Sequence, residues 1–147
     1  MIPTTPLIII EDDLDHKLLI KTALESLQHQ ITAVFFDDPE IAFNFLIQTP
    51  IKPLIVLSNL DGLEYRRKLH QKGNLLSMAT PFILFTTNLK QKYFTDVASQ
   101  LIHGIFVKPT TLEGMRELLK TTLDHWCNGS NSKNRRQPST GRFLKQV

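Results

Sequence analysis

The sequence predicts an α/β fold, an open doubly wound sheet of five parallel strands in the order 2-1-3-4-5 with helices on both faces. Two observations carry this prediction. Short apolar runs of strand length alternate five times with segments in which apolar residues recur at helical spacing. Polar residues directly follow four of these runs, as expected where the carboxyl ends of parallel strands meet at one edge of a sheet.

The expected strands are apolar runs rich in β-branched or aromatic residues. This composition suits strands that are buried on both faces of a parallel sheet. Pro53 introduces the third strand and Gly104 the fifth. The five strands are expected over residues 7–10, 31–36, 54–57, 82–85 and 105–107.

Each strand is followed by an expected helix, marked by apolar residues three or four positions apart. Asp38 is expected to cap the second helix, with Pro39 in its first turn. Gly73 is expected to end the third helix. The apolar stripes of the five helices run through residues 20–27, 41–46, 63–69, 93–101 and 112–126.

Length and composition favour one domain followed by a tail. The chain has 147 residues, is 41% hydrophobic and 21% charged, and has a single cysteine, which excludes an internal disulfide. Residues 127–147 contain five Lys and Arg residues and no acid, so they carry +5, and residues 1–126 carry −2 of the net +3. We therefore expect a folded domain over 1–126 and a basic, disordered tail over 127–147.

The sequence also predicts a cytoplasmic protein without membrane contact. No apolar run approaches the ~20 residues that span a bilayer. The N-terminal residues lack the basic region of a signal peptide.

Chemically distinctive residues follow four of the expected strands. Glu11 and Asp12 follow the first strand, Ser58 and Asn59 the third, Thr86 the fourth and Lys108 the fifth. Clustered carboxylates repel one another unless a cation or a lysine ammonium lies between them. A hard cation, a lysine and a hydroxyl around a carboxylate nucleophile are the parts that phosphoryl transfer uses.

These motifs, in this order, resemble the receiver domains of two-component response regulators, in particular the stand-alone chemotaxis type. They are the pair Glu11-Asp12, Thr86, the segment 106–109 and the segment 61–64. The resemblance implies a flavodoxin-like receiver fold. It also implies an aspartate at the end of the third strand that accepts a phosphoryl group from a sensor kinase histidine, and an acidic pair that holds Mg²⁺. A lysine and a threonine would contact the phosphoryl group, and an aromatic residue on the fifth strand would act as a switch.

The chain departs from this pattern at the acceptor itself. Asn59 takes the place of the aspartate, or Ser58 does if the alignment moves by one residue. Neither is a carboxylate, and an amide cannot form an acyl phosphate. Asn59 and Asp61 are two positions apart, so the loop that follows the acceptor is several residues shorter than in the family. Ile105 stands at the switch position, where the family has an aromatic residue.

We therefore expect a degenerate receiver, or pseudo-receiver, that acts by binding other proteins without being phosphorylated, and that has no enzyme active site. Glu11 and Asp12 are expected to bind Mg²⁺ weakly or not at all, and no other cofactor is expected. Asp61 is expected to be a turn and helix-cap residue.

The expected partners are a sensor histidine kinase or another signalling protein. The expected binding surface is the face of the fourth helix, fifth strand and last helix, which would also serve a homodimer. This face is expected to carry Lys90, Lys92 and Tyr93, with His103 and Arg116 nearby. Two other functions stay open. One is a phosphorylatable single-domain regulator with an altered acceptor such as Asp61. The other, less expected, is nucleic-acid binding through the tail, which has five cations and almost no aromatic residues among them.

Overall fold

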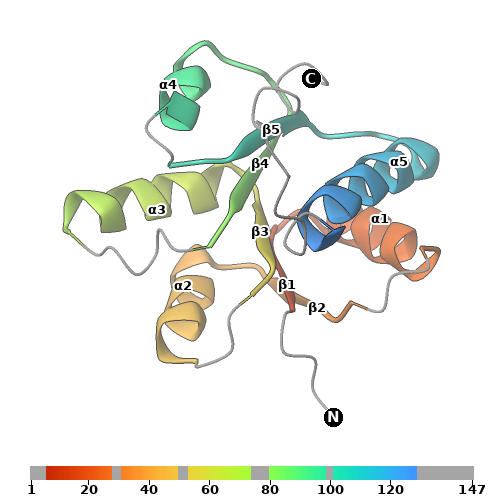
Figure 1. Ribbon diagram of the computed structural model, residues 1–147, viewed down its shortest axis with the longest axis horizontal. Helices are drawn as coiled ribbons and strands as arrows, with labels where there is room; N and C mark the ends of the chain where they lie inside the picture. The colour runs from red at the N-terminus through yellow and green to blue at the C-terminus, as the bar shows by residue number, and fades with distance from the viewer. Residues whose placement is uncertain (1–5, 28–30, 50–52, 74–79, 99–100, 129–147) are drawn as a thin grey trace.

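Five strands form one parallel sheet in the order β2-β1-β3-β4-β5, which confirms the predicted fold class (Figure 1). The computed structural model describes residues 6–27, 31–49, 53–73, 80–98 and 101–128. The strands are β1 (Leu7–Ile10), β2 (Ala33–Phe36), β3 (Ile55–Ser58), β4 (Phe82–Thr86) and β5 (Gly104–Val107). The helices are α1 (Leu14–Glu25), α2 (Pro39–Gln48), α3 (Leu60–Gln71), α4 (Lys92–Ala98) and α5 (Leu112–Leu123), followed by the π-helical turn η2 (Asp124–Asn128).

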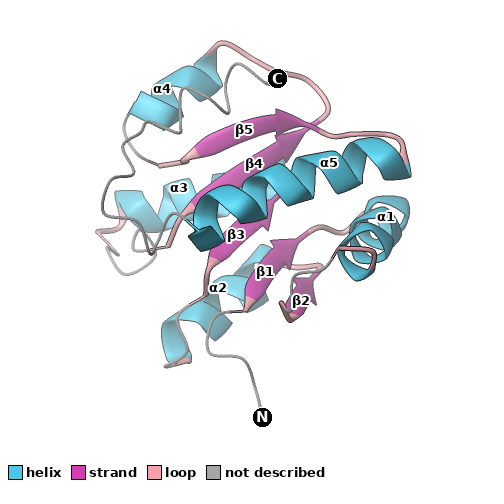
Figure 2. Ribbon diagram, turned by 45° about the vertical axis from the view of Figure 1, so that its right-hand side comes forward, coloured by secondary structure: helices cyan, strands magenta, loops and turns pink. Residues whose placement is uncertain are grey.

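The helices cover both faces of the sheet, with α1 and α5 on one face and α2, α3 and α4 on the other (Figures 1 and 2). β1 is an interior strand of the sheet and lies between β2 and β3. Its side chains alternate between the two cores. Leu7 and Ile9 pack with α1 and α5, whereas Ile8 and Ile10 pack with α2 and α3. A strand buried on both faces needs apolar residues at every position, which explains the unbroken run.

Helix caps set where several helices begin. Asp13, Asp38 and Thr111 each accept a backbone N–H of the first turn of α1, α2 and α5. Pro39 occupies the first turn of α2, as the sequence predicts, and Gly73 follows α3 with a φ of 82°. These residues satisfy backbone groups that a helix leaves unpaired at its ends.

Some details of the sequence prediction are wrong. α3 begins at Leu60, and its cap is Asn59 instead of Asp61, which lies in the first turn of the helix. Leu112 is exposed, so it does not belong to the buried face of α5. Leu101 is buried but lies beyond the end of α4.

Other predictions fall at or beyond the limits of the described residues. Most of the connection expected over 74–80 and the tail from residue 129 onward lie outside them. Helical structure continues to Asn128, past the expected domain boundary at residue 126. Within the described segments, no helix combines the length and apolar character needed to cross a membrane.

The β3–α3 junction contains no intervening loop beyond Asn59, and the helix therefore starts close against the strand. Gly62 permits this approach. A Cβ atom at residue 62 would lie 1.8 Å from Ser58 Oγ and 3.1 Å from Ser58 Cβ. Ser58 is itself held in place, because its Oγ donates a hydrogen bond to the carbonyl oxygen of Asn59 at 2.9 Å.

We predict that Gly62→Ala lowers the free energy of unfolding by about 1–3 kcal/mol, the usual cost of overpacking a core. The Ser58→Ala background should reduce that cost, since the closest clashing atom is removed. Urea denaturation of the two single variants and the double variant measures this coupling. Gly114→Ala, where the closest atom would lie 3.1 Å away, is the matched control. Equal costs in both backgrounds would contradict the proposed contact.

Candidate functional site

The carboxyl ends of the strands surround a pocket of about 260 Å³. Five of the six chemically distinctive residues that directly follow the predicted strands contribute to its lining, namely Glu11, Asp12, Asn59, Thr86 and Lys108. Ser58 and Ile105 do not line it. The remaining lining residues are Asp13, Leu60, Asp61, Phe85 and Thr87.

Asn59 occupies the position at the end of β3 that faces the acids. Its backbone N–H donates to the carbonyl oxygen of Ile10 at 3.0 Å, which continues the pairing of β3 with β1. Its side-chain Oδ1 accepts the backbone N–H of Gly62 at 3.1 Å, so the amide caps α3. Its Nδ2 then points to Asp12 and donates to Oδ1 at 3.3 Å. The N–H of Gly62 needs an acceptor, and this requirement fixes which end of the amide faces Asp12.

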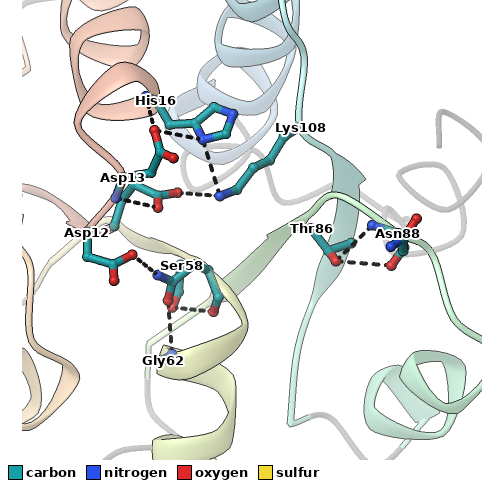
Figure 3. A network of polar contacts seen from close by, with 10 residues as sticks. Asp12, Asp13, His16, Ser58, Gly62, Thr86, Asn88 and Lys108 are labelled. Atoms are coloured by element: carbon teal, nitrogen blue, oxygen red, sulfur yellow. Dashed lines mark hydrogen bonds and ion pairs between the residues drawn. The ribbon is translucent and has the colours of Figure 1, made fainter.

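Ser58, the alternative acceptor position, lies on the other side of the junction. Its side chain is buried, and its hydroxyl is bound to the backbone carbonyl of Asn59 beneath the first turn of α3 (Figure 3). The pairing of Ser58 with Ile10 places Asn59, and not Ser58, opposite the acids that follow β1.

Lys108 forms a buried ion pair with Glu11. The distance from Nζ to Oε1 is 2.7 Å, and the two side chains are only 11% and 4% exposed. The other carboxylate oxygen of Glu11 accepts the backbone N–H of Asp13 at 3.1 Å. Both oxygens of Glu11 therefore have donors within the protein, as a buried charge requires.

His16 is a neighbour of this ion pair that the sequence analysis did not single out. Its Nδ1 lies 3.5 Å from Lys108 Nζ and 3.4 Å from Asp13 Oδ1, and Figure 3 shows the three side chains turned toward one another. The backbone N–H of His16 donates to the Asp13 carboxylate at 2.9 Å, and this hydrogen bond lowers the pKa of Asp13. The position of His16, one turn into α1 from the acidic pair, is the signal that could have identified it.

The residues that correspond to the family's switch pair are held in place separately. The hydroxyl of Thr86 donates to the carbonyl oxygen of Asn88 at 3.0 Å and accepts the N–H of Asn88 at 3.3 Å, a closed turn set apart from the acids in Figure 3. Ile105 is fully buried in the apolar core on the face of the sheet that α2, α3 and α4 cover (Figure 1).

The residues present do not fit a Mg²⁺ ion. Magnesium requires oxygen ligands in near-octahedral geometry. At residue 59 the group that faces Asp12 is an amide nitrogen carrying hydrogen atoms, and the amide oxygen is used by α3. Glu11 is neutralised by Lys108. Among the residues that the structure describes, no three His, Cys, Asp or Glu side chains are grouped so that they could hold a metal.

Comparisons with known proteins identify the fold. No family model matches the sequence, and no curated protein matches it either. Solved structures do match, including the phosphorylated cyanobacterial phytochrome response regulator RcpA, at a TM-score of 0.71 with 18% identity over 85% of this chain and 95% of that one. The fold is that of response regulator receiver domains.

Two further structures agree with this receiver fold. Response regulator RPA3017 of R. palustris, from red light signalling, has a TM-score of 0.70 with 20% identity over 84% of this chain and 94% of that one. The Mn²⁺-bound response regulator Rcp1 has a TM-score of 0.67 with 17% identity over 91% and 99%. At these identities the likeness shows the fold, and the chemistry of the site must be argued from its own residues.

We predict that Asn59→Asp destabilises the protein near neutral pH. The new carboxylate still caps α3 but stands about 3 Å from Asp12, and like charges at that distance repel. The variant should regain stability relative to the parent as the pH falls and a carboxylate takes up a proton. Millimolar Mg²⁺ should raise the melting temperature of the variant and leave that of the parent unchanged.

Thermal denaturation across pH, with and without Mg²⁺, tests this prediction. Asn59→Ala is the control, because it removes the contact with Asp12 without adding a charge, and it should lose about 1 kcal/mol with its helix cap at every pH. A parent protein that Mg²⁺ stabilises as strongly as the Asp variant would show that the amide does not exclude the cation.

Proposed function

We propose that this chain is a pseudo-receiver of two-component signalling that acts by protein–protein interaction independent of phosphorylation. The receiver fold supports the signalling class. The observation that carries the proposal is the amide of Asn59, because its oxygen is bound to Gly62 and its nitrogen to Asp12 at the position of the acceptor.

The other carboxylates of the pocket are poor substitutes for the missing acceptor. Glu11 is paired with Lys108, and Asp12 is bound to Asn59. Asp13 caps α1. Asp61 is exposed in the first turn of α3, and none of the hydrogen bonds or ion pairs described above joins it to Lys108. An attacking carboxylate needs a cation or lysine to stabilise the phosphoryl oxygens, and Lys108 already serves Glu11.

The proposed partner is a sensor histidine kinase or another signalling protein that docks on the face of α4, β5 and α5. Lys90 and Lys92 are exposed near α4 and remain candidates for this surface. Tyr93 is buried, and Arg116 turns to α1, where its Nε donates to Ser26 Oγ at 2.7 Å. The sequence analysis placed both on this face, so the proposed surface is smaller than expected. A homodimer through the same face is the alternative occupant.

The proposal extends to organisation and location. We take residues 1–126 as the receiver-fold domain and 127–147 as a separate basic tail in a cytoplasmic protein that is not an enzyme. The tail carries five cations and no acid. Its charge suits an acidic partner, and nucleic acid is the weaker alternative because the sequence contains no binding motif.

We predict that acetyl phosphate or beryllofluoride with Mg²⁺ leaves this protein unmodified, because residue 59 has no carboxylate to form an acyl phosphate. Intact-mass spectrometry at neutral pH checks the outcome. A receiver domain that retains the acceptor aspartate is the positive control. An acid-labile adduct mapped to Asp61, Asp12 or Asp13 would instead establish a phosphorylatable regulator with an altered acceptor.

A further inference from the structure

Arg66 is a fully buried arginine outside the pocket, on the inner side of α3. Its Nε donates to the carbonyl oxygen of Leu101 at 2.7 Å, and its guanidinium lies over the ring of Phe82, 4.8 Å from the centroid. Burial lowers the pKa of Arg66 to about 10, so the side chain is still charged at neutral pH. Burying a charged group is costly, and such a group is retained where its contacts organise the structure around it.

The neighbouring residue reaches the same segment from the same helix. Arg67 Nη2 pairs with Asp96 Oδ2 at 2.8 Å, and the Asp96 side chain is only 11% exposed. The carbonyl oxygen of Asp96 in turn accepts the backbone N–H groups of Leu101 and Ile102, at 2.9 and 3.3 Å. Asp96 belongs to α4, and residues 101 and 102 lie shortly before β5, which begins at Gly104. The two arginines therefore tie both ends of the α4–β5 connection to α3.

Helix α4 depends on contacts with the rest of the protein. It has seven residues, and isolated helices of that length are not stable in water. Figure 1 shows it at the edge of the molecule, beyond α3. Tyr93 of α4 is buried together with Leu101 and Ile102 in the apolar core on this face of the sheet. The arginines add polar contacts to this packing.

His103 pairs the start of β5 with β4 through two hydrogen bonds to Phe82. His103 Nδ1 accepts the backbone N–H of Phe82 at 3.0 Å, while the N–H of His103 donates to the Phe82 carbonyl oxygen at 2.7 Å. The first of these bonds requires an unprotonated Nδ1. Burial, and then the nearby charge of Arg66, lower the pKa of His103 and favour that form.

We propose that Arg66 and Arg67 form a clamp that holds α4 and the start of β5 against α3 in one arrangement. The docking face at α4 and β5 is then positioned by two side chains of α3. Its relevance to signalling rests on the proposed function, whereas the clamp itself is a property of the fold. A phosphoryl adduct at the pocket would overturn the proposed function and leave the clamp standing.

Amide hydrogen exchange of the full chain tests the clamp in Arg66→Met and Arg67→Gln. The amides of Leu101 and Ile102 should exchange about tenfold to a hundredfold faster in each variant, the effect of losing a hydrogen bond to a charged group. The amides of β1 should keep their rates. Lys68→Gln, an exposed neighbour on the same helix, is the matched control and should change neither set.

Two results would overturn the clamp. One is parent-like exchange at Leu101 and Ile102 in both variants. The other is equal acceleration of these amides and those of β1, which would mean that the arginines support only global stability. If Arg66→Met does not fold, Arg67→Gln decides the question alone, because Arg67 is 31% exposed and its replacement leaves the buried guanidinium of Arg66 and its contacts in place.

Discussion

The side-chain amide of Asn59 connects the end of β3 to the start of α3 and to the acidic residues that follow β1, and the rest of the site depends on this connection. A helix that starts directly after a strand needs an acceptor for its first N–H groups, and Asn59 Oδ1 supplies it to Gly62. The same side chain then presents Nδ2 to Asp12, which follows β1. Because one amide hydrogen-bonds both Gly62 of α3 and Asp12, residue 59 has a structural role at the end of β3. A loop of several residues at this point would free residue 59 from capping α3.

The pocket keeps acids and a lysine, and it balances their charges internally. Lys108 forms an ion pair with Glu11, Asn59 donates a hydrogen bond to Asp12, and a backbone N–H in the first turn of α1 donates to Asp13. Each of these three carboxylates thus accepts a hydrogen bond or forms an ion pair within the protein. The hydroxyl of Thr86 is hydrogen-bonded to Asn88 in a turn, and the side chain of Ile105 is buried in the core. In the proposed clamp, Arg66 and Arg67 of α3 hold α4 and the start of β5.

The strand order and most element positions could be predicted because they follow from local patterns. The unbroken run at residues 7–10 is typical of a central strand, and the Asp38-Pro39 pair marks a helix start. The cap at Asn59 was missed because an aspartate before a glycine is the more common turn signal, so Asp61 was preferred. The burial of Arg66 could not be predicted, since the sequence does not show that Leu101 and Phe82 contact its guanidinium. Tertiary contacts determine both the cap at Asn59 and the burial of Arg66, and local sequence propensity does not reveal such contacts.

The most direct test of this account is the response of the Asn59 side-chain amide to a divalent cation. In ¹⁵N-resolved spectra of the unmodified protein, the Nδ2 protons of Asn59 give a signal at the centre of the pocket. Mn²⁺ is a suitable probe because it broadens nearby signals, and the similar receiver fold of Rcp1 has been solved in its Mn²⁺-bound form. The account predicts that submillimolar Mn²⁺ leaves the signals of Asn59, Glu11 and Asp12 sharp. Selective broadening of these signals, reversed by Mg²⁺, would show that the pocket still holds a cation and would contradict it.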